Sequence, residues 1–306
     1  MLAFNQMGNL GRLGNQMFQY AAVRGISAMR GYEFGIPPFE SKRVDNYSLH
    51  RAFTLESVGR SNLAVLDRGH APVVIEKHFE FDEELHKMCP NDVSLFGFFQ
   101  TEKYFKNIEM DIRRDFTFHE SILTPCKEMI ESLDQAPLFL HVRRGDPNLV
   151  DARGFKWSYT ECSGQHPPQP VEYYEKALKE FPKDQPIVVC SDSPEWVNEQ
   201  EFFADDRFLV SEPTDKYPDG SYEPFVDLCI MSLCSGAIIA NSSLSWWGAW
   251  LQKGGEKLGK DSIQRHWRVV APEPWFGIKY DMYDMKDLIP PRWLKLYNDP
   301  SYIEPE

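Results

Sequence analysis

Cysteine is scarce in this chain of 306 residues, and its six cysteines form no Cys-x-x-Cys pair. Their spacing matches no zinc or disulfide framework, which argues against a small fold held together by metal or disulfides. Three cysteines lie inside apolar runs, where free thiols are usually buried; they are Cys190, Cys229 and Cys234. We therefore expect reduced thiols and a reducing compartment.

Long hydrophobic runs are also missing. The most apolar stretch, residues 225–240, is too short to span a bilayer and contains Asp227. The first residues lack a basic segment followed by a long apolar segment, so we expect no signal peptide. Together these features predict a cytoplasmic protein without stable membrane insertion.

Positive charge is in short supply. The chain has 33 Lys and Arg against 46 Asp and Glu, which gives a net charge of −13. A protein that binds nucleic acid needs a basic face to release counterions from the phosphates, and no Lys/Arg run of that kind occurs. Nucleic acid is therefore excluded as a partner, and the acidity favours solubility.

The sequence does contain an alternation of apolar segments and helical patterns, which predicts a parallel α/β sheet. The expected strands cover residues 1–7, 31–37, 93–100, 136–142, 185–190, 236–240 and 267–272. The expected helices cover residues 15–30, 101–116, 171–181, 223–234 and a segment that opens at 241. A hydrophobic content of 42% is enough for two cores. We predict an N-terminal domain over residues 1–134 and a C-terminal domain over residues 135–306.

A glycine-rich loop, GNLGRLGNQMFQYAA, occupies residues 8–22 between the first expected strand and a helix. We expect Asn15 to be the N-cap of that helix and Gly31 to end it. The glycines do not follow the Gly-x-Gly-x-x-Gly pattern of dinucleotide-binding proteins, although Glu33 lies where a ribose acceptor would be found. Such a loop can also bring backbone and the amide of Asn15 close to another ligand.

Three of the expected strands in the C-terminal half end in polar residues. The first gives His141, Arg143, Arg144 and Asp146, the second gives Ser191 and Asp192, and the third gives Asn241, Ser242 and Ser243. In open parallel sheets, ligands bind outside the carboxyl ends of the strands. Paired arginines and a helix start both suit phosphate oxygens, and no Asp-x-Asp motif is present to hold Mg²⁺. The pattern predicts a diphosphate site that works without a metal.

Each part of this pattern also has a purely structural interpretation. An arginine pair after a strand is often a surface ion-pair partner, and Asn-Ser-Ser is often a plain helix cap. His141 is more often a buried histidine than a ligand. Three tryptophans of the last helix, Trp246, Trp247 and Trp250, are more often core than site.

Four segments together resemble the α-1,2-fucosyltransferases. They are GRLGNQMFQYA (11–21), HVRRGD (141–146), CSDSPEWV (190–197) and NSSLSWWGAWL (241–251). The resemblance implies a GT-B-like α/β fold with two Rossmann-like domains that face a cleft. It also implies transfer of L-fucose from GDP-β-L-fucose to the 2-hydroxyl of a terminal β-galactoside, with inversion and with neither a cofactor nor an essential metal. The acceptor would be lactose or a repeat of a surface glycan.

The resemblance assigns three residues to catalysis. Arg143 would contact the β-phosphate as it leaves, and Asn15 would reach across the cleft to the donor or the acceptor. Asp146 is the candidate general base, with His141 and the leaving phosphate as alternatives. The residues expected to bind the donor are Gly14, His141, Arg144, Asp192, Asn241, Ser242 and Ser243, with Asp192 directed at guanosine.

Three other functions fit parts of the sequence. The first is a different nucleotide-sugar enzyme, such as an inverting fucosyltransferase that forms another linkage, and analysis of the product linkage separates it. A non-catalytic glycan-binding module would use the tryptophans and tyrosines, but it gives no reason for Arg143 and Arg144. A dehydrogenase would bind NAD through Gly11 and Glu33.

Overall fold

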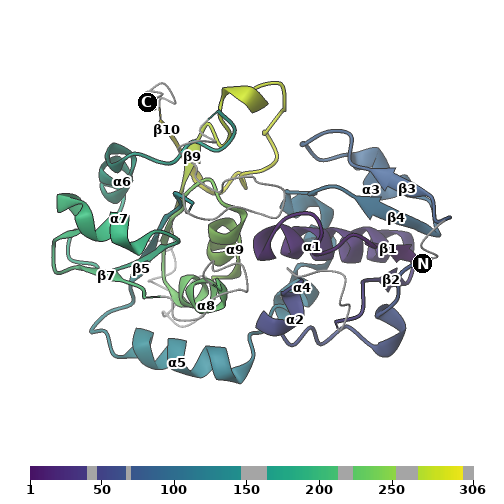
Figure 1. Ribbon diagram of the computed structural model, residues 1–306, viewed down its shortest axis with the longest axis horizontal. Helices are drawn as coiled ribbons and strands as arrows, with labels where there is room; N and C mark the ends of the chain where they lie inside the picture. The colour runs from purple at the N-terminus through teal and green to yellow at the C-terminus, as the bar shows by residue number, and fades with distance from the viewer. Residues whose placement is uncertain (40–46, 67–69, 146–163, 213–222, 253–267, 299–306) are drawn as a thin grey trace. The chain divides into compact units, whose positions relative to one another are not determined.

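The protein divides into two α/β units (Figure 1). Unit 1 contains Met1–Glu120 and Tyr283–Pro290, and unit 2 contains Ser121–Met282 and Pro291–Glu306. The computed structural model describes residues 1–39, 47–66, 70–145, 164–212, 223–252 and 268–298. None of the helices in these ranges combines the length and the apolar composition that a membrane span requires.

Unit 1 is built on a parallel sheet with the strand order β2-β1-β4-β3. The strands are β1 (Leu2–Ala3), β2 (Phe34–Gly35), β3 (Val73–Ile75) and β4 (Val93–Phe96). The α-helices are α1 (Leu13–Arg30), α2 (Leu49–Ala52), α3 (Glu83–Met88) and α4 (Glu109–Asp115). Short 3-10 turns are η1 (Arg60–Asn62), η2 (Glu102–Tyr104) and η3 (Lys106–Ile108).

Helix α1 follows β1 as predicted, but it begins earlier than expected. Its N-cap is Arg12, so Asn15 lies inside the first turn and the predicted N-cap was wrong. Gly31 ends the helix in the left-handed conformation with φ 67°, which glycine adopts without steric cost. Most of the helix is buried, with Met29 among its exposed positions. Helix α1 is therefore buried on more than one face.

The predicted helix over residues 101–116 is broken into η2, η3 and α4. Gly25 of α1 explains the break, because a Cβ added there would lie 2.0 Å from the carbonyl oxygen of Tyr104. The backbone of η2 is thus packed directly against α1, and Asn107 Nδ2 donates to the Gly25 carbonyl at 3.0 Å. Tertiary packing here overrides the local preference for one continuous helix.

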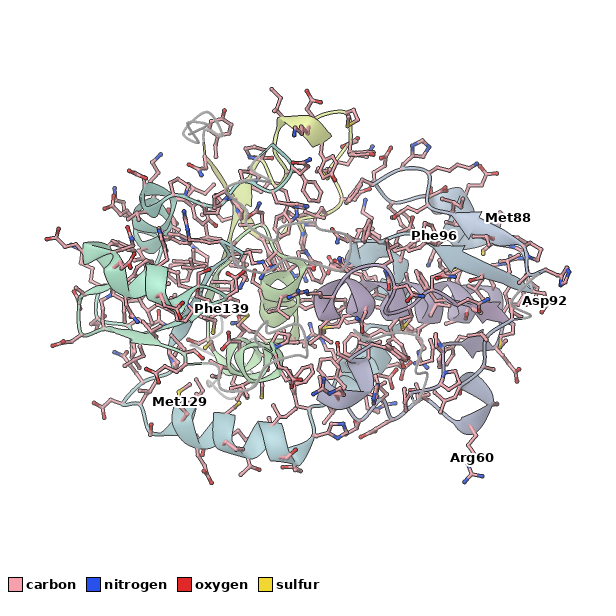
Figure 2. The ribbon with its side chains drawn as sticks, in the orientation of Figure 1. Arg60, Met88, Asp92, Phe96, Met129 and Phe139 are labelled. Atoms are coloured by element: carbon pink, nitrogen blue, oxygen red, sulfur yellow. The ribbon has the colours of Figure 1, made fainter. Side chains whose placement is uncertain are left out.

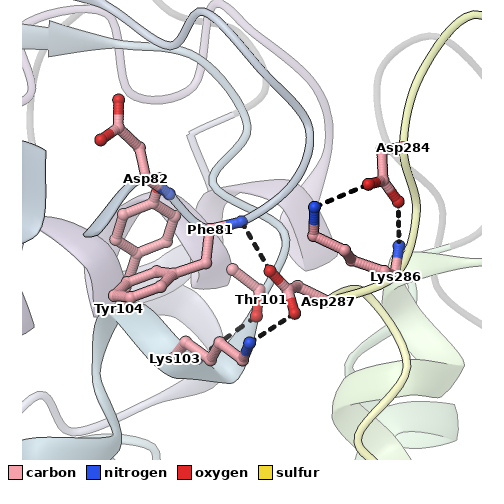
Figure 3. Close-up of polar contacts among 8 residues, drawn as sticks. All are labelled: Phe81, Asp82, Thr101, Lys103, Tyr104, Asp284, Lys286 and Asp287. Atoms are coloured by element: carbon pink, nitrogen blue, oxygen red, sulfur yellow. Dashed lines mark hydrogen bonds and ion pairs between the residues drawn. The ribbon is translucent and has the colours of Figure 1, made fainter. Parts of the chain in front are cut away.

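Residues 283–290 return to unit 1 through contacts that are far apart in the sequence (Figure 3). Asp287 forms an ion pair with Lys103, with 2.5 Å between Nζ and Oδ1. Its Oδ2 also accepts from the backbone N–H of Phe81 at 3.0 Å. The division therefore differs from a single boundary at residue 134, because the chain crosses near residue 120 and contributes this later segment as well.

Unit 2 is built on a parallel sheet with the order β10-β9-β8-β5-β6-β7. The strands are β5 (Leu138–Val142), β6 (Ile187–Ser191), β7 (Phe208–Val210), β8 (Ala237–Ile238), β9 (Val269–Glu273) and β10 (Leu294–Tyr297). The helices are α5 (Glu120–Glu131), α6 (Val171–Leu178), α7 (Pro194–Glu199), α8 (Phe225–Leu233) and α9 (Ser243–Leu251). Two 3-10 turns are η4 (Glu201–Phe203) and η5 (Ile278–Tyr280).

The core of unit 2 surrounds the central strands. Phe139 of β5, labelled in Figure 2, is fully buried. Three tryptophans of α9 are buried and in ring contact, which confirms that they belong to the core; they are Trp246, Trp247 and Trp250. The thiols predicted to be buried, Cys190, Cys229 and Cys234, are buried and free of disulfides.

Three strands were not predicted, and all three lie at sheet edges. β3 ends one side of the first sheet, while β7 and β10 end the two sides of the second. Their side chains are mostly half-buried or exposed. Strands of this kind lack the continuous apolar run that marks a strand covered on both faces.

Candidate functional site

The sheet of unit 2 brings the three predicted strand ends to one edge. β8, β5 and β6 are neighbours and run parallel, so their carboxyl ends coincide. Arg143 directly follows β5, Asp192 directly follows β6, and Ser242 precedes α9 after β8. The predicted meeting of these groups at one sheet edge is therefore confirmed by the strand order.

Asp192 holds the turn that carries the arginines. Its Oδ2 accepts from Arg143 Nη1 and from the backbone N–H of Gly145, the latter at 2.8 Å. Its Oδ1 accepts from the backbone N–H of Arg144 at 3.0 Å. Ser193 adds a further bond, since its hydroxyl donates to the Gly145 carbonyl at 2.8 Å. Three donors from one turn thus bind this carboxylate, and the predicted contact with guanosine stays a prediction.

Arg143 and Arg144 have different surroundings. The Arg143 side chain is about one-fifth exposed (19%) beside Asp192. The Arg144 guanidinium lies over the ring of Trp196 on α7, 4.0 Å from its centroid, and burial lowers the pKa of Arg144. Trp196 was quoted within the CSDSPEWV segment but was not predicted to touch an arginine. The two adjacent arginines are therefore fixed by different partners.

His141 is a buried, uncharged histidine. Its exposed fraction is 3%, and its Nδ1 has no hydrogen-bond partner within the described parts of the chain. Burial lowers the pKa of His141 to about 3, and the positive charge of Arg143 acts in the same direction while Asp192 opposes it. The imidazole is thus neutral at physiological pH. Its predicted contact with the diphosphate or ribose stays a prediction.

At the start of α9, Ser242 caps the helix and the side-chain amide of Asn241 binds a neighbouring loop. Ser242 is the N-cap, and its Oγ accepts from the backbone N–H of Leu244 at 3.3 Å. Asn241 is buried and donates to the Pro167 carbonyl at 2.9 Å, so it connects the strand end to a neighbouring loop. Ser243 is the first helical residue and is half-buried. Among the three residues predicted here, Ser242 and Ser243 are the half-buried ones, with part of their surface open to a ligand.

Asp227 is a buried acid near the site that the sequence did not point to as functional. It lies on α8 and accepts from the Ser211 hydroxyl at 2.6 Å. Burial raises the pKa of Asp227 to about 6, the Ser211 bond opposes this rise, and the negative charge of Asp192 adds to it. The only sequence signal was a carboxylate inside an otherwise apolar run.

Replacing Asp227 by asparagine is expected to stabilise the protein increasingly as the pH rises. The folded-state pKa of Asp227 lies above its ordinary value. Its contribution to the free energy of unfolding is therefore fully present below the ordinary pKa and is lost as the pH rises past 6. Between pH 3 and pH 7 the unfolding free energy of the variant should rise by about 3 kcal/mol relative to that of the wild type. Urea unfolding at four pH values measures this, and a difference independent of pH would contradict it.

The predicted residues of unit 1 lie at the start of α1. Gly14 is buried in the first turn, and Asn15 is half-buried with its Oδ1 accepting from Gln100 Nε2 at 2.8 Å. Glu33, the ribose acceptor of the dehydrogenase interpretation, precedes β2 and is exposed. That places Glu33 at the amino end of its strand, whereas nucleotides bind at the carboxyl ends. Glu33 is therefore not at the sheet edge where the dehydrogenase interpretation needs a ribose acceptor.

Two further expectations concern the general base and the absence of a metal. Asp146, the candidate general base, lies outside the described residues. Within the described ranges, no three His, Cys, Asp or Glu side chains are grouped so that they could hold a metal ion.

The fold and the strand-end site define a class of protein. The solved structure of the fucosyltransferase NodZ from Bradyrhizobium is similar, with a TM-score of 0.50 at 11% identity over 82% of this chain and 93% of that chain. Two α/β units with parallel sheets and this likeness correspond to a GT-B glycosyltransferase fold. The chain belongs to glycosyltransferase family 11, because residues 3–258 match the family described as Glycosyl transferase family 11.

Curated relatives have related names at modest identity. An Escherichia coli protein named alpha-1,2-colitosyltransferase is 27% identical over 94% of this chain and 96% of its own length. Human galactoside alpha-(1,2)-fucosyltransferase 1 is 24% identical over 92% of this chain and 76% of its own length. The resemblance to the α-1,2-fucosyltransferases is thus confirmed at the level of the family.

Proposed function

We propose that this enzyme transfers L-fucose from GDP-β-L-fucose to the 2-hydroxyl of a terminal β-galactoside, with inversion at the anomeric carbon. The observation that carries the proposal is the Arg143 turn at the carboxyl edge of the unit 2 sheet. Asp192 holds that turn on the same edge as the start of α9. A guanidinium and a helix N-terminus both stabilise phosphate oxygens.

The proposed reaction is a single displacement with oxocarbenium character. The galactose 2-oxygen forms a bond to fucose C1 while the bond from C1 to the β-phosphate oxygen breaks. Charge that develops on GDP is stabilised by Arg143 and by the first turn of α9, which removes the need for a metal. Ser242 and Ser243 supply hydroxyl groups at the same helix start.

The proton of the attacking hydroxyl goes to a general base. His141 is a poor candidate, because it is buried and its pKa is lowered to about 3. We assign the role to Asp146, with the leaving phosphate as the alternative acceptor. Replacing Asp146 by asparagine separates the two, since only the first assignment predicts a large loss of kcat.

The name of the E. coli relative supports one alternative donor. That protein is named for colitose and shares the α-1,2 linkage with the human relative. Parallel assays with GDP-fucose and with GDP-colitose compare the two sugars on the same galactoside. A higher kcat/KM for GDP-fucose is the result that the proposal predicts.

Transfer is expected to be unaffected by metal removal. Purified protein would be incubated with GDP-fucose and lactose, with and without excess EDTA, and release of GDP would be followed. Rates within about twofold of each other are expected, since arginine and a helix terminus provide the charge stabilisation. A loss of activity with EDTA that added Mg²⁺ or Mn²⁺ restores would contradict the metal-free mechanism.

A further inference from the structure

Two loops meet at the carboxyl edge of the unit 1 sheet. One follows β1 and leads through the glycines to Asn15, and the other follows β4 and leads to Gln100. β1 and β4 are hydrogen-bonded neighbours, so the two loops start side by side. Gln19 joins them, because its Nε2 donates to the carbonyl of Leu10 at 2.8 Å and to that of Gly97 at 3.2 Å.

The amide of Asn15 is held between these loops. Its Oδ1 accepts from Gln100 Nε2 at 2.8 Å, and Gln100 is itself buried. Its Nδ2 lies against Gly11, where an added Cβ would be only 2.2 Å away and where φ is +85°. With the oxygen engaged by Gln100, the Nδ2 hydrogens are the donors that this amide can offer to an oxygen of a ligand.

Glu76 fixes the turn that leads from β4 to Gln100 through two hydrogen bonds. The two carboxylate oxygens accept from the backbone N–H groups of Phe98 at 2.7 Å and of Phe99 at 2.9 Å. Phe99 has a positive φ of 54°, which a bulky residue adopts only where its surroundings impose it. Gly97 leaves room for the Glu76 side chain, since an added Cβ would lie 2.4 Å from Glu76 Cβ and 2.6 Å from its Oε2. This arrangement ends β4 at Phe96, earlier than the strand predicted over residues 93–100.

We propose that Gln100 is a positioning residue, which orients the Asn15 amide so that Nδ2 donates to an oxygen of the sugar substrate. Glu76 supports it by fixing the turn between β4 and Gln100. The proposal rests on the proposed function and on the role that the family resemblance implies for Asn15, a contact with the donor or the acceptor. It goes further because it names Gln100 as the residue that orients the Asn15 amide, and Nδ2 rather than Oδ1 as the atom that faces the substrate.

A double-mutant cycle tests this role. Asn15→Ala should lower kcat/KM by about 10²-fold, and Gln100→Ala should lower it by about tenfold, because a misplaced donor loses most of its effect. If Gln100 acts only through Asn15, the double variant should be no worse than Asn15→Ala alone. Losses that multiply in the double variant would overturn the proposal, as would a Gln100→Ala enzyme within twofold of wild type.

Gln185 provides a matched control. It is a buried glutamine whose Nε2 donates to the Ala136 carbonyl at 3.0 Å and to Ser235 Oγ at 2.9 Å, near the amino ends of the unit 2 strands. Gln185→Ala should lower stability but leave kcat/KM of the folded enzyme unchanged. A similar fall in kcat/KM for both glutamine variants would show a general folding effect and overturn the positioning role.

A second readout does not depend on turnover. In protein labelled with ¹⁵N-asparagine, the Asn15 side-chain amide signal is expected to shift on Gln100→Ala, and to move less on Gln185→Ala. An unchanged Asn15 signal would overturn the orientation by Gln100 even in an inactive enzyme. If Gln100→Ala shifts the Asn15 signal but the wild-type protein transfers no fucose, the proposed function would be contradicted while the orientation by Gln100 would stand.

Discussion

Replacing Arg143 by alanine is expected to lower the rate of fucose transfer by about 10²–10³-fold, the usual cost of removing one donor to a developing oxyanion. The guanidinium is held by Asp192 at the strand end where the diphosphate is proposed to bind. Lysine should restore little, because an ammonium does not reproduce the planar fork that contacts two oxygens at once. Initial rates at saturating GDP-fucose measure the loss of turnover, and calorimetry with GDP measures the change in nucleotide affinity.

Arg113 is a suitable control for this experiment. It lies on α4 of unit 1 and pairs with Glu109 on the same helix, 3.0 Å between Nη2 and Oε1. Arg113→Ala should keep transfer near the wild-type rate, since surface pairs of this spacing contribute little. An Arg143→Ala enzyme that turns over within threefold of wild type would rule out the role given to Arg143.

Replacing Asp115 by alanine is expected to cost about 3–5 kcal/mol of stability, as is usual when one partner of a buried ion pair is removed. Asp115 is fully buried at the end of α4. It pairs with Arg24 at 3.3 Å and accepts from the hydroxyl of Tyr20 and the N–H of Ser57, both at 2.8 Å. The substitution therefore leaves a cation and two polar groups of unit 1 without their acceptor.

Urea unfolding followed by circular dichroism measures this loss. The chain has eight tryptophans, all within the residues of unit 2, so tryptophan fluorescence reports on that unit separately. The variant should lower the circular-dichroism midpoint more than the fluorescence midpoint. Asp111→Ala on the same helix, where the side chain is 44% exposed, should change stability by less than about 0.5 kcal/mol. A loss below 1 kcal/mol for Asp115→Ala would contradict the structural role of the network.

The sequence was sufficient to predict the central strands and the edge at which they end. Strands covered on both faces, such as β5 and β6, are almost entirely apolar, and every residue in them is buried. The polar residues directly after them therefore stand out, and parallel pairing brings them together. The same reasoning missed β3, β7 and β10, whose exposed edges interrupt the apolar pattern.

Contacts between distant residues account for what could not be predicted. The role of Asp192 depends on three donors that lie 47 to 49 residues away. The bond between Gln100 and Asn15 spans 85 residues, and the ion pair between Lys103 and Asp287 spans 184. No local pattern encodes such partners, which is why the domain boundary and the supporting side chains appear only in the folded chain.

The most direct test of the central claim is the linkage of the product. The purified enzyme would be incubated with GDP-fucose and lactose, and the trisaccharide would be analysed by NMR, with the Arg143→Ala variant run in parallel. The account predicts an α-linked fucose on the 2-hydroxyl of galactose, formed by the wild type and lost in the variant. Fucose on any other hydroxyl, or an active wild type that the Arg143 substitution leaves unchanged, would contradict it.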